Sequence, residues 1–214
     1  MITAADALER LERGNRRFAS GGPERPAATG RTRREELLTA QNPFAIVLGC
    51  SDSRVPAEII FDQGLGDLFV IRVAGNVVAP SLLGSIEFSA QRHGVRLVVV
   101  LGHSLCGAIL ATIEELERPS ANRSPNLASI VNRIRPTVET LIESGLGKDR
   151  GALVRHATRA NVRASVAHVR HGSPIIEELI AHEGLRVVGA EYSLESGLVD
   201  FFDVETARSG GVEH

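Results

Sequence analysis

The chain has 214 residues, of which 43% are hydrophobic and 23% charged, and its 24 Lys and Arg against 26 Asp and Glu give a net charge of −2. This composition excludes a disordered chain, and it argues against a nucleic-acid partner because proteins that neutralise phosphates are normally basic. Without Trp and with a single Tyr, the chain is also poorly supplied with the aromatic side chains that stack on bases or sugars. The chain has no run of about 18 apolar residues, so no membrane span is predicted. The acidic residues near the start do not fit a signal peptide, so we expect a cytoplasmic protein with no membrane partner.

The first predicted element is an amphipathic helix over residues 3–19, followed by a loop and a short charged helix over 31–40. These segments form a predicted N-terminal helical arm of about residues 1–40, whose loop is expected to wrap the surface or a partner subunit. Continuous apolar runs follow, and such runs are typical of parallel strands buried on both faces. They cover residues 44–49, 68–73, 97–102 and 185–190.

Helical patterns separate these runs, and we expect Pro136 to break or kink one of the helices. The patterns cover residues 56–61, 81–93, 108–116, 128–144, 153–169 and 174–182. A last strand over 198–202 follows Ser196-Gly197 and is expected to fold back antiparallel. The alternation predicts a single α/β domain over residues 1–214, with a mostly parallel central sheet, flanking helices and a C-terminal antiparallel edge strand.

Both cysteines lie just after predicted strands. Cys50 follows the first apolar run, and His103 and Cys106 follow the third. Because polar groups at the carboxyl ends of parallel strands meet at one edge of the sheet, these three side chains are expected to converge. Two cysteines and one histidine form a known catalytic zinc arrangement, with a fourth position open to water or to Asp52.

Two other interpretations of these residues remain open. In the first, the buried cysteines are small hydrophobic residues, and in the second, Cys106 and His103 form a nucleophile and base pair. A disulfide is disfavoured because a cytosolic chain keeps its thiols reduced. His168 and His171, spaced three apart on a predicted helix, are a weaker metal candidate, since a solvated helix face explains them as well.

Beyond these features, the sequence resembles the β-class carbonic anhydrases. Cys-Ser-Asp-Ser-Arg at 50–54 is followed by His-Ser-Leu-Cys-Gly at 103–107, and the likeness extends to 55–58, 72–76, 84–88 and 191–197. The resemblance implies one zinc ion per chain bound by Cys50, His103 and Cys106, with Asp52 and Arg54 as a dyad beside the metal. It implies the reversible hydration of carbon dioxide to bicarbonate, by attack of zinc-bound hydroxide on CO2. Two thiolates cancel the charge of zinc, so we expect a higher water pKa than at a three-histidine site, and activity that rises into alkaline pH.

The resemblance further implies a homodimer, or a larger oligomer built from dimers, with substrate pockets at the dimer interface. Gln41, Phe69 and Phe88 match the positions of pocket residues, and Gln41 would donate a hydrogen bond to bicarbonate. Val47 replaces a Trp found in members that bicarbonate inactivates, although Arg72 and Tyr192 match other parts of that regulatory pocket. We therefore expect a constitutively open enzyme. The alternatives are a CS2 or COS hydrolase on the same fold, and a non-catalytic zinc-binding module.

Overall fold

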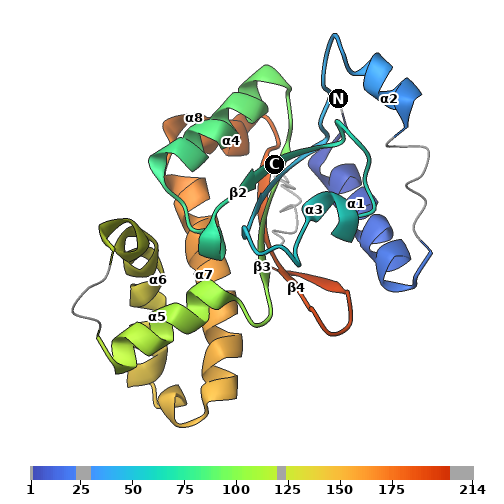
Figure 1. Ribbon diagram of the computed structural model, residues 1–214. Helices are drawn as coiled ribbons and strands as arrows, with labels where there is room; N and C mark the ends of the chain where they lie inside the picture. Colours follow the sequence, from blue (N-terminus) through green and yellow to red (C-terminus); the bar gives the residue numbers. More distant parts are fainter. Residues whose placement is uncertain (1, 23–29, 120–123, 203–214) are drawn as a thin grey trace, which may run out of the picture.

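The computed structural model describes residues 2–22, 30–119 and 124–202 (Figure 1). Its strands form one sheet in the order β2-β1-β3-β4-β5, in which β1 to β4 run parallel and β5 runs antiparallel to β4. The strands are β1 Ala45–Gly49, β2 Leu68–Arg72, β3 Leu97–His103, β4 Arg186–Tyr192 and β5 Val199–Phe202. The predicted mostly parallel sheet with an antiparallel edge strand is confirmed.

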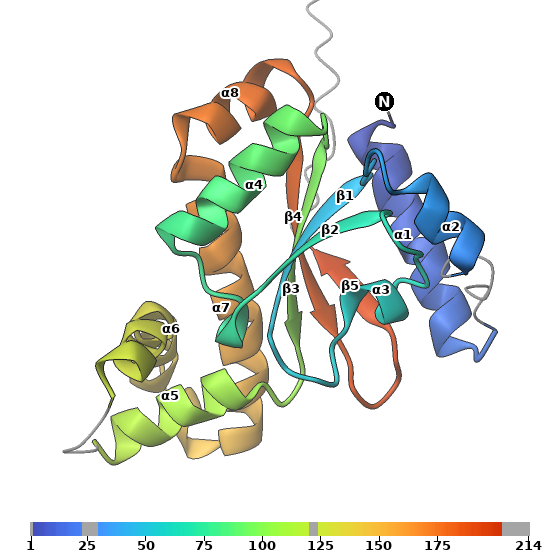
Figure 2. The ribbon, with the colours of Figure 1, turned by 45° about the horizontal axis from the view of Figure 1, so that its top comes forward.

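Helices cover both faces of this sheet. Figure 2 shows α4, α7 and α8 on one face, α1 and α3 on the other, and α5 and α6 beyond the end at which β3 terminates. The helices are α1 Ala4–Ala19, α2 Arg31–Glu36, α3 Ala57–Ile60, α4 Pro80–Arg92, α5 Gly107–Glu117, α6 Pro125–Glu143, α7 Arg150–His171 and α8 Pro174–His182, with short 3-10 turns η2 Ala74–Asn76 and η3 Leu146–Lys148. Within the described ranges, no helix is both long and apolar enough to cross a membrane.

The central strands explain the continuous apolar runs of the sequence. Every residue of β1 and of β3 is buried, because helices pack on both faces of these strands. Alternate side chains enter different cores: Val47 packs toward α1 and α3, whereas Ile46 and Leu48 pack toward α4, α7 and α8. This rigid sheet carries the residues that follow its strands.

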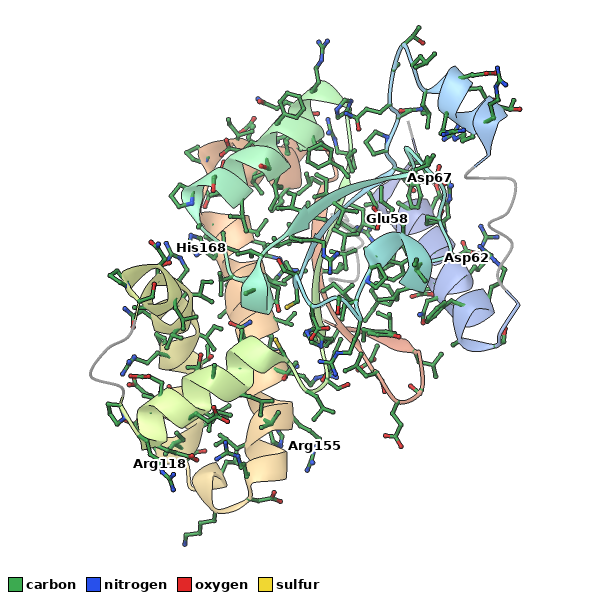
Figure 3. The ribbon with its side chains drawn as sticks, viewed as in Figure 1. Glu58, Asp62, Asp67, Arg118, Arg155 and His168 are labelled. Atoms are coloured by element: carbon green, nitrogen blue, oxygen red, sulfur yellow. The ribbon has the colours of Figure 1, made fainter. Side chains whose placement is uncertain are left out.

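The helix α1 packs against the sheet of its own chain, with Leu8 and Leu11 in the core. The backbones of α1 and α3 approach closely at Gly14, where an added Cβ would lie 1.9 Å from the carbonyl oxygen of Phe61. Any side chain larger than hydrogen would collide there. Figure 3 shows Asp62 and Asp67, which follow α3, on the side of the molecule that carries α1 and α2. Both carboxylates pair with arginines of those helices: Arg17 with Asp62, and Arg10 and Arg33 with Asp67.

Several helix ends differ from the prediction. The short helix α2 ends at Glu36 instead of residue 40, and α7 begins at Arg150 because the Asp149 side chain accepts a hydrogen bond from the Ala152 N–H. Of the predicted break or kink at Pro136, the break does not occur, since α6 continues through that residue. Buried residues on both sides of Pro136, Ile134 and Val138 among them, hold α6 against its neighbours. The predicted loop of residues 20–30 lies mostly outside the described residues.

Candidate metal centre

The carboxyl ends of β1 and β3 bring the predicted ligands together. These two strands are parallel neighbours, and Cys50 follows β1 while His103 ends β3. Cys106 directly precedes α5. The Sγ atoms of Cys50 and Cys106 lie 4.0 Å apart, and the ligand atoms of all three buried residues lie within 4.8 Å of one another. Among the described residues no other group of histidine, cysteine and carboxylate side chains gathers in this way.

The imidazole of His103 presents one nitrogen to the two sulfur atoms. Its Nδ1 lies 2.9 Å from the carbonyl oxygen of Ser104, and because a carbonyl only accepts, Nδ1 carries the proton. The buried Nε2 therefore has a free lone pair, and no described residue forms a hydrogen bond with it. The Ser104 turn is fixed to β4, since its N–H donates to Tyr192 O and its Oγ accepts from Leu194 N. A fixed tautomer with a free Nε2 is the state in which histidine ligates metals.

The environment of the two thiols favours a thiolate. The Cys106 thiol, the His103 ring and the Gly75 N–H lower the pKa of Cys50 to about 4, against the opposing effect of burial. The Gly75 N–H lies 3.3 Å from the Cys50 Sγ. Because Cys106 shares its proton with that thiolate, the pKa of Cys106 is raised. Two neighbouring sulfurs that share one negative charge, beside an unpaired imidazole nitrogen, fit a cation in their midst.

Asp52 and Arg54 form a bidentate ion pair at the edge of this cluster. The Arg54 Nε and Nη2 donate to the two carboxylate oxygens of Asp52 at 2.9 and 2.7 Å, and the Arg54 backbone N–H donates to Oδ1 at 3.0 Å. These hydrogen bonds hold the pKa of Asp52 well below its usual range. Asp52 Oδ2 also lies 3.8 Å from His103 Nε2. A carboxylate that is ionised at neutral pH therefore lies beside the cluster and is turned toward Arg54.

The three predicted pocket residues lie elsewhere in the same chain. Phe69 is opposite Ile46 near the amino end of β1, and Gln41 is exposed before that strand begins. Phe88, on α4, is 54% exposed and contacts Phe69, with 6.2 Å between ring centroids. Because a five-residue strand spans roughly 15 Å, Gln41 and Cys50 stand at opposite ends of β1. The chain does not bring Gln41 to its own metal cluster.

The weaker metal candidate of the sequence is not supported. His168 is exposed on α7 (Figure 3). His171 lies 3.5 Å from Glu177, and neither histidine belongs to a ligand cluster among the described residues. A solvated helix face explains both histidines.

Gly75 is a site residue whose role the sequence analysis did not identify. It adopts a positive φ of 72°, which turns its N–H toward the Cys50 sulfur. An added Cβ would lie 2.8 Å from Ile134 and 2.9 Å from Ala108, so the position needs glycine on both counts. The pair Gly75-Asn76 after an apolar run indicates a turn. It does not indicate that the Gly75 N–H contacts the Cys50 sulfur, because that contact depends on how β2 pairs with β1.

Known proteins match this fold and these motifs over most of the chain. Residues 45–199 match the family model described as carbonic anhydrase. A carbonic anhydrase of Mycolicibacterium smegmatis is 40% identical, over 91% of each chain, and carbonic anhydrase 2 of Mycobacterium tuberculosis is 40% identical over 89% of each. A tetrameric β-carbonic anhydrase of Sordaria macrospora superimposes with a TM-score of 0.71 at 27% identity, covering 81% of this chain and 87% of that one.

The sheet is mostly parallel, and the carboxyl ends of its strands carry two thiols, an imidazole and a carboxylate that is paired with Arg54. These features are typical of an α/β metalloenzyme. The agreement of motifs, sequence and fold then specifies the family. The chain belongs to the carbonic anhydrase family and has the fold of its β class.

Proposed function

We propose that this protein is a zinc-dependent carbonic anhydrase, which interconverts carbon dioxide and water with bicarbonate and a proton. The donor set of Cys50, His103 and Cys106, with the carboxylate of Asp52 held beside it, is the observation that carries this proposal. The 40% identity to two proteins named carbonic anhydrase supports the same reaction.

Zinc is the metal that this donor set suits best. Two thiolates and one imidazole are soft and borderline ligands, and three protein ligands with an open fourth position are typical of catalytic rather than structural zinc. When bound, one zinc ion per chain would supply a water molecule of lowered pKa as the nucleophile. Because both cysteines must be reduced to bind it, we retain the cytoplasm as the proposed location.

Asp52 is placed to orient the nucleophile. Its ionised carboxylate can accept a hydrogen bond from the O–H of an attacking hydroxide, which leaves an oxygen lone pair directed at CO2. Arg54 holds both carboxylate oxygens and prevents Asp52 from entering the fourth ligand position itself. In this account Asp52 acts on the reacting oxygen, and Arg54 acts through Asp52.

A second copy of the chain would complete the substrate pocket. Gln41, Phe69 and Phe88 are proposed to approach the metal centre of the partner, since they lie far from their own. The exposed ring of Phe88 and the position of β2 at the edge of the sheet support contact with another subunit at this end. Phe69 and Phe88 would then enclose an apolar gas, and Gln41 would donate a hydrogen bond to bicarbonate.

Metal removal tests the proposal directly. Protein stripped with a strong zinc chelator is expected to lose CO2 hydration, and one equivalent of zinc per chain is expected to restore it. Cys106→Ala should hold less zinc and stay inactive in the same assay. Equal hydration by stripped and loaded protein would refute a zinc-dependent reaction.

A further inference from the structure

The side chain of Arg72 forms two hydrogen bonds with backbone carbonyls outside its own strand. Arg72 is the last residue of β2, and its side chain crosses to the segment that follows β1. There its Nε donates to the carbonyl oxygen of Cys50 at 2.9 Å, and its Nη2 donates to the carbonyl oxygen of Asp52 at 2.6 Å. One guanidinium therefore holds the backbone of a metal-binding cysteine and of the neighbouring carboxylate residue.

These hydrogen bonds continue the β1–β2 pairing past the end of the strands. The Val73 N–H donates to Gly49 O, and the Ser51 N–H donates to Val73 O. Arg72 then binds the two carbonyls on either side of Ser51. The segment from Gly49 to Asp52 is thereby fixed at successive points against the end of β2.

The geometry requires the planar fork of an arginine. Its Nε–H and Nη2–H point in the same direction at a fixed spacing, and so it can bind two carbonyl oxygens at once. A lysine ammonium is a single point on a flexible stem and would bind one of the two. The substitution Arg72→Lys therefore keeps the charge and removes the two-point contact.

We propose that Arg72 is a positioning residue for Asp52. Arg54 directs the carboxylate of Asp52, and Arg72 sets the place of its backbone relative to Cys50, so two arginines fix one catalytic side chain. The inference rests on the proposed function, because that function gives Asp52 its catalytic role. In this structure the Nε and Nη2 of Arg72 are engaged by the chain's own backbone.

The first test compares Arg72→Lys with a matched control. Arg96 also donates from its side chain to two backbone carbonyls, those of Ala90 and Val95, but it precedes β3 at the opposite end of the sheet. We expect Arg72→Lys to lower kcat/KM about tenfold, as loss of a supporting contact around a metal site typically does, with zinc still at one per chain. Arg96→Lys should leave kcat/KM unchanged. Equal kinetics of Arg72→Lys and the wild type would overturn the proposal.

A double-mutant cycle separates positioning from a general structural role. If Arg72 acts through Asp52, Arg72→Lys should cost nothing further in kcat/KM once Asp52→Asn is present. The same tenfold loss in both backgrounds would show that Arg72 acts on something other than Asp52, and the proposal would fail.

Crystal structures of the zinc-loaded wild type and Arg72→Lys give a readout that does not depend on activity. The variant should show Asp52 displaced from its bidentate contact with Arg54, while Cys50, His103 and Cys106 remain on the metal. An unmoved Asp52 would overturn the proposal. If the wild type fails to hydrate CO2, the proposed function falls, yet the displacement of Asp52 still decides whether Arg72 positions it.

Discussion

At the scale of single residues, Asp52 has the most contacts with the groups that the proposed function uses. Its carboxylate accepts three hydrogen bonds from Arg54, and its carbonyl accepts one from Arg72. It is not one of the three residues whose ligand atoms form the metal cluster. Orientation of the nucleophile and retention of the metal should therefore be separable functions.

Asp52→Asn is expected to separate these functions. The amide keeps the size of the side chain but has no charge, and its NH2 donates where a carboxylate oxygen accepted, so CO2 hydration should fall by between about 10-fold and 100-fold. Zinc should remain at one per chain, as measured by elemental analysis. Asp67→Asn, which alters a carboxylate paired with Arg10 and Arg33, is the matched control and should keep full activity. Loss of zinc from Asp52→Asn would contradict the assigned role.

The charge of Asp52 does not set the pH dependence of activity near neutrality. Because Arg54 lowers the pKa of Asp52, the carboxylate is ionised throughout the neutral and alkaline range. Its effect on folding has the sign of a depressed carboxyl pKa: it stabilises the folded chain above the unfolded pKa of about 3.9, and this contribution is lost as the pH falls below that value. An activity change between neutral and alkaline pH must come from another group.

Residue identities predicted the metal cluster but not the contacts that support it. Cys50, His103 and Cys106 follow apolar runs that become neighbouring strands, so their convergence could be inferred. The contacts of Gly75 and Arg72 depend on how β2 pairs with β1 beyond Gly49. That register cannot be read from the sequence, so the contacts of Gly75 and Arg72 with the Cys50 segment are seen only in the folded chain.

At the scale of elements, Asn15 is a buried polar link between α1 and the rest of the chain. Its buried side chain donates to the carbonyls of Ile60 and Gly197 and accepts from the Val199 N–H. A buried amide with three backbone partners fixes the helix to both α3 and β5. The hydrophobic face of α1 supplies the area of contact, and Asn15 defines its position.

Asn15→Ala should weaken this docking measurably. Three hydrogen bonds at about 1 kcal/mol each predict a loss of about 3 kcal/mol. For a chain of this size that corresponds to a Tm lower by roughly 6–12 °C. Asn132→Ala, on an exposed position of α6, should change stability by less than about 0.5 kcal/mol. A Tm of Asn15→Ala equal to that of the control would show that the hydrogen bonds of Asn15 do not stabilise the docking of α1.

Element type was predictable where the hydrophobic pattern is strong, and helix ends were not. The continuous apolar runs became β1 and β3, in which every residue is buried because helices cover both faces. The extension of α6 back to Pro125 depends on a proline at its first turn, and the extension of α7 depends on the Asp149 cap. Tertiary packing also overrode the local signal at Pro136.

At the scale of the whole molecule, the chain separates its metal centre from its predicted pocket residues. The metal centre lies at the carboxyl edge of the sheet, whereas Gln41 and Phe69 lie toward the other edge. The sequence pattern identified the metal ligands and the pocket residues but not the distance between them. The direction of β1 shows that the two groups of residues lie at opposite ends of the sheet within one chain.

Subunit complementation tests whether a partner supplies Gln41. Dimers formed from equal amounts of Gln41→Ala and Asp52→Asn chains should regain about one quarter of wild-type activity, because half of the dimers are mixed and each holds one intact site. A mixture of Asp52→Asn and Cys106→Ala chains should regain none, since both changes damage the chain's own metal centre. Absence of recovery in the first mixture would place Gln41 outside the partner's pocket.

This metal centre is proposed to hydrate CO2 with a nucleophile whose pKa is set by two thiolates. Stopped-flow CO2 hydration by zinc-quantified protein, from neutral to alkaline pH, tests this proposal most directly. We predict fast hydration that rises with pH, because two thiolates reduce the electron demand of the metal and raise the pKa of its water. A rate that is already flat below neutral pH would contradict the role of the thiolates. No hydration at any pH, with one zinc per chain, would contradict the function itself.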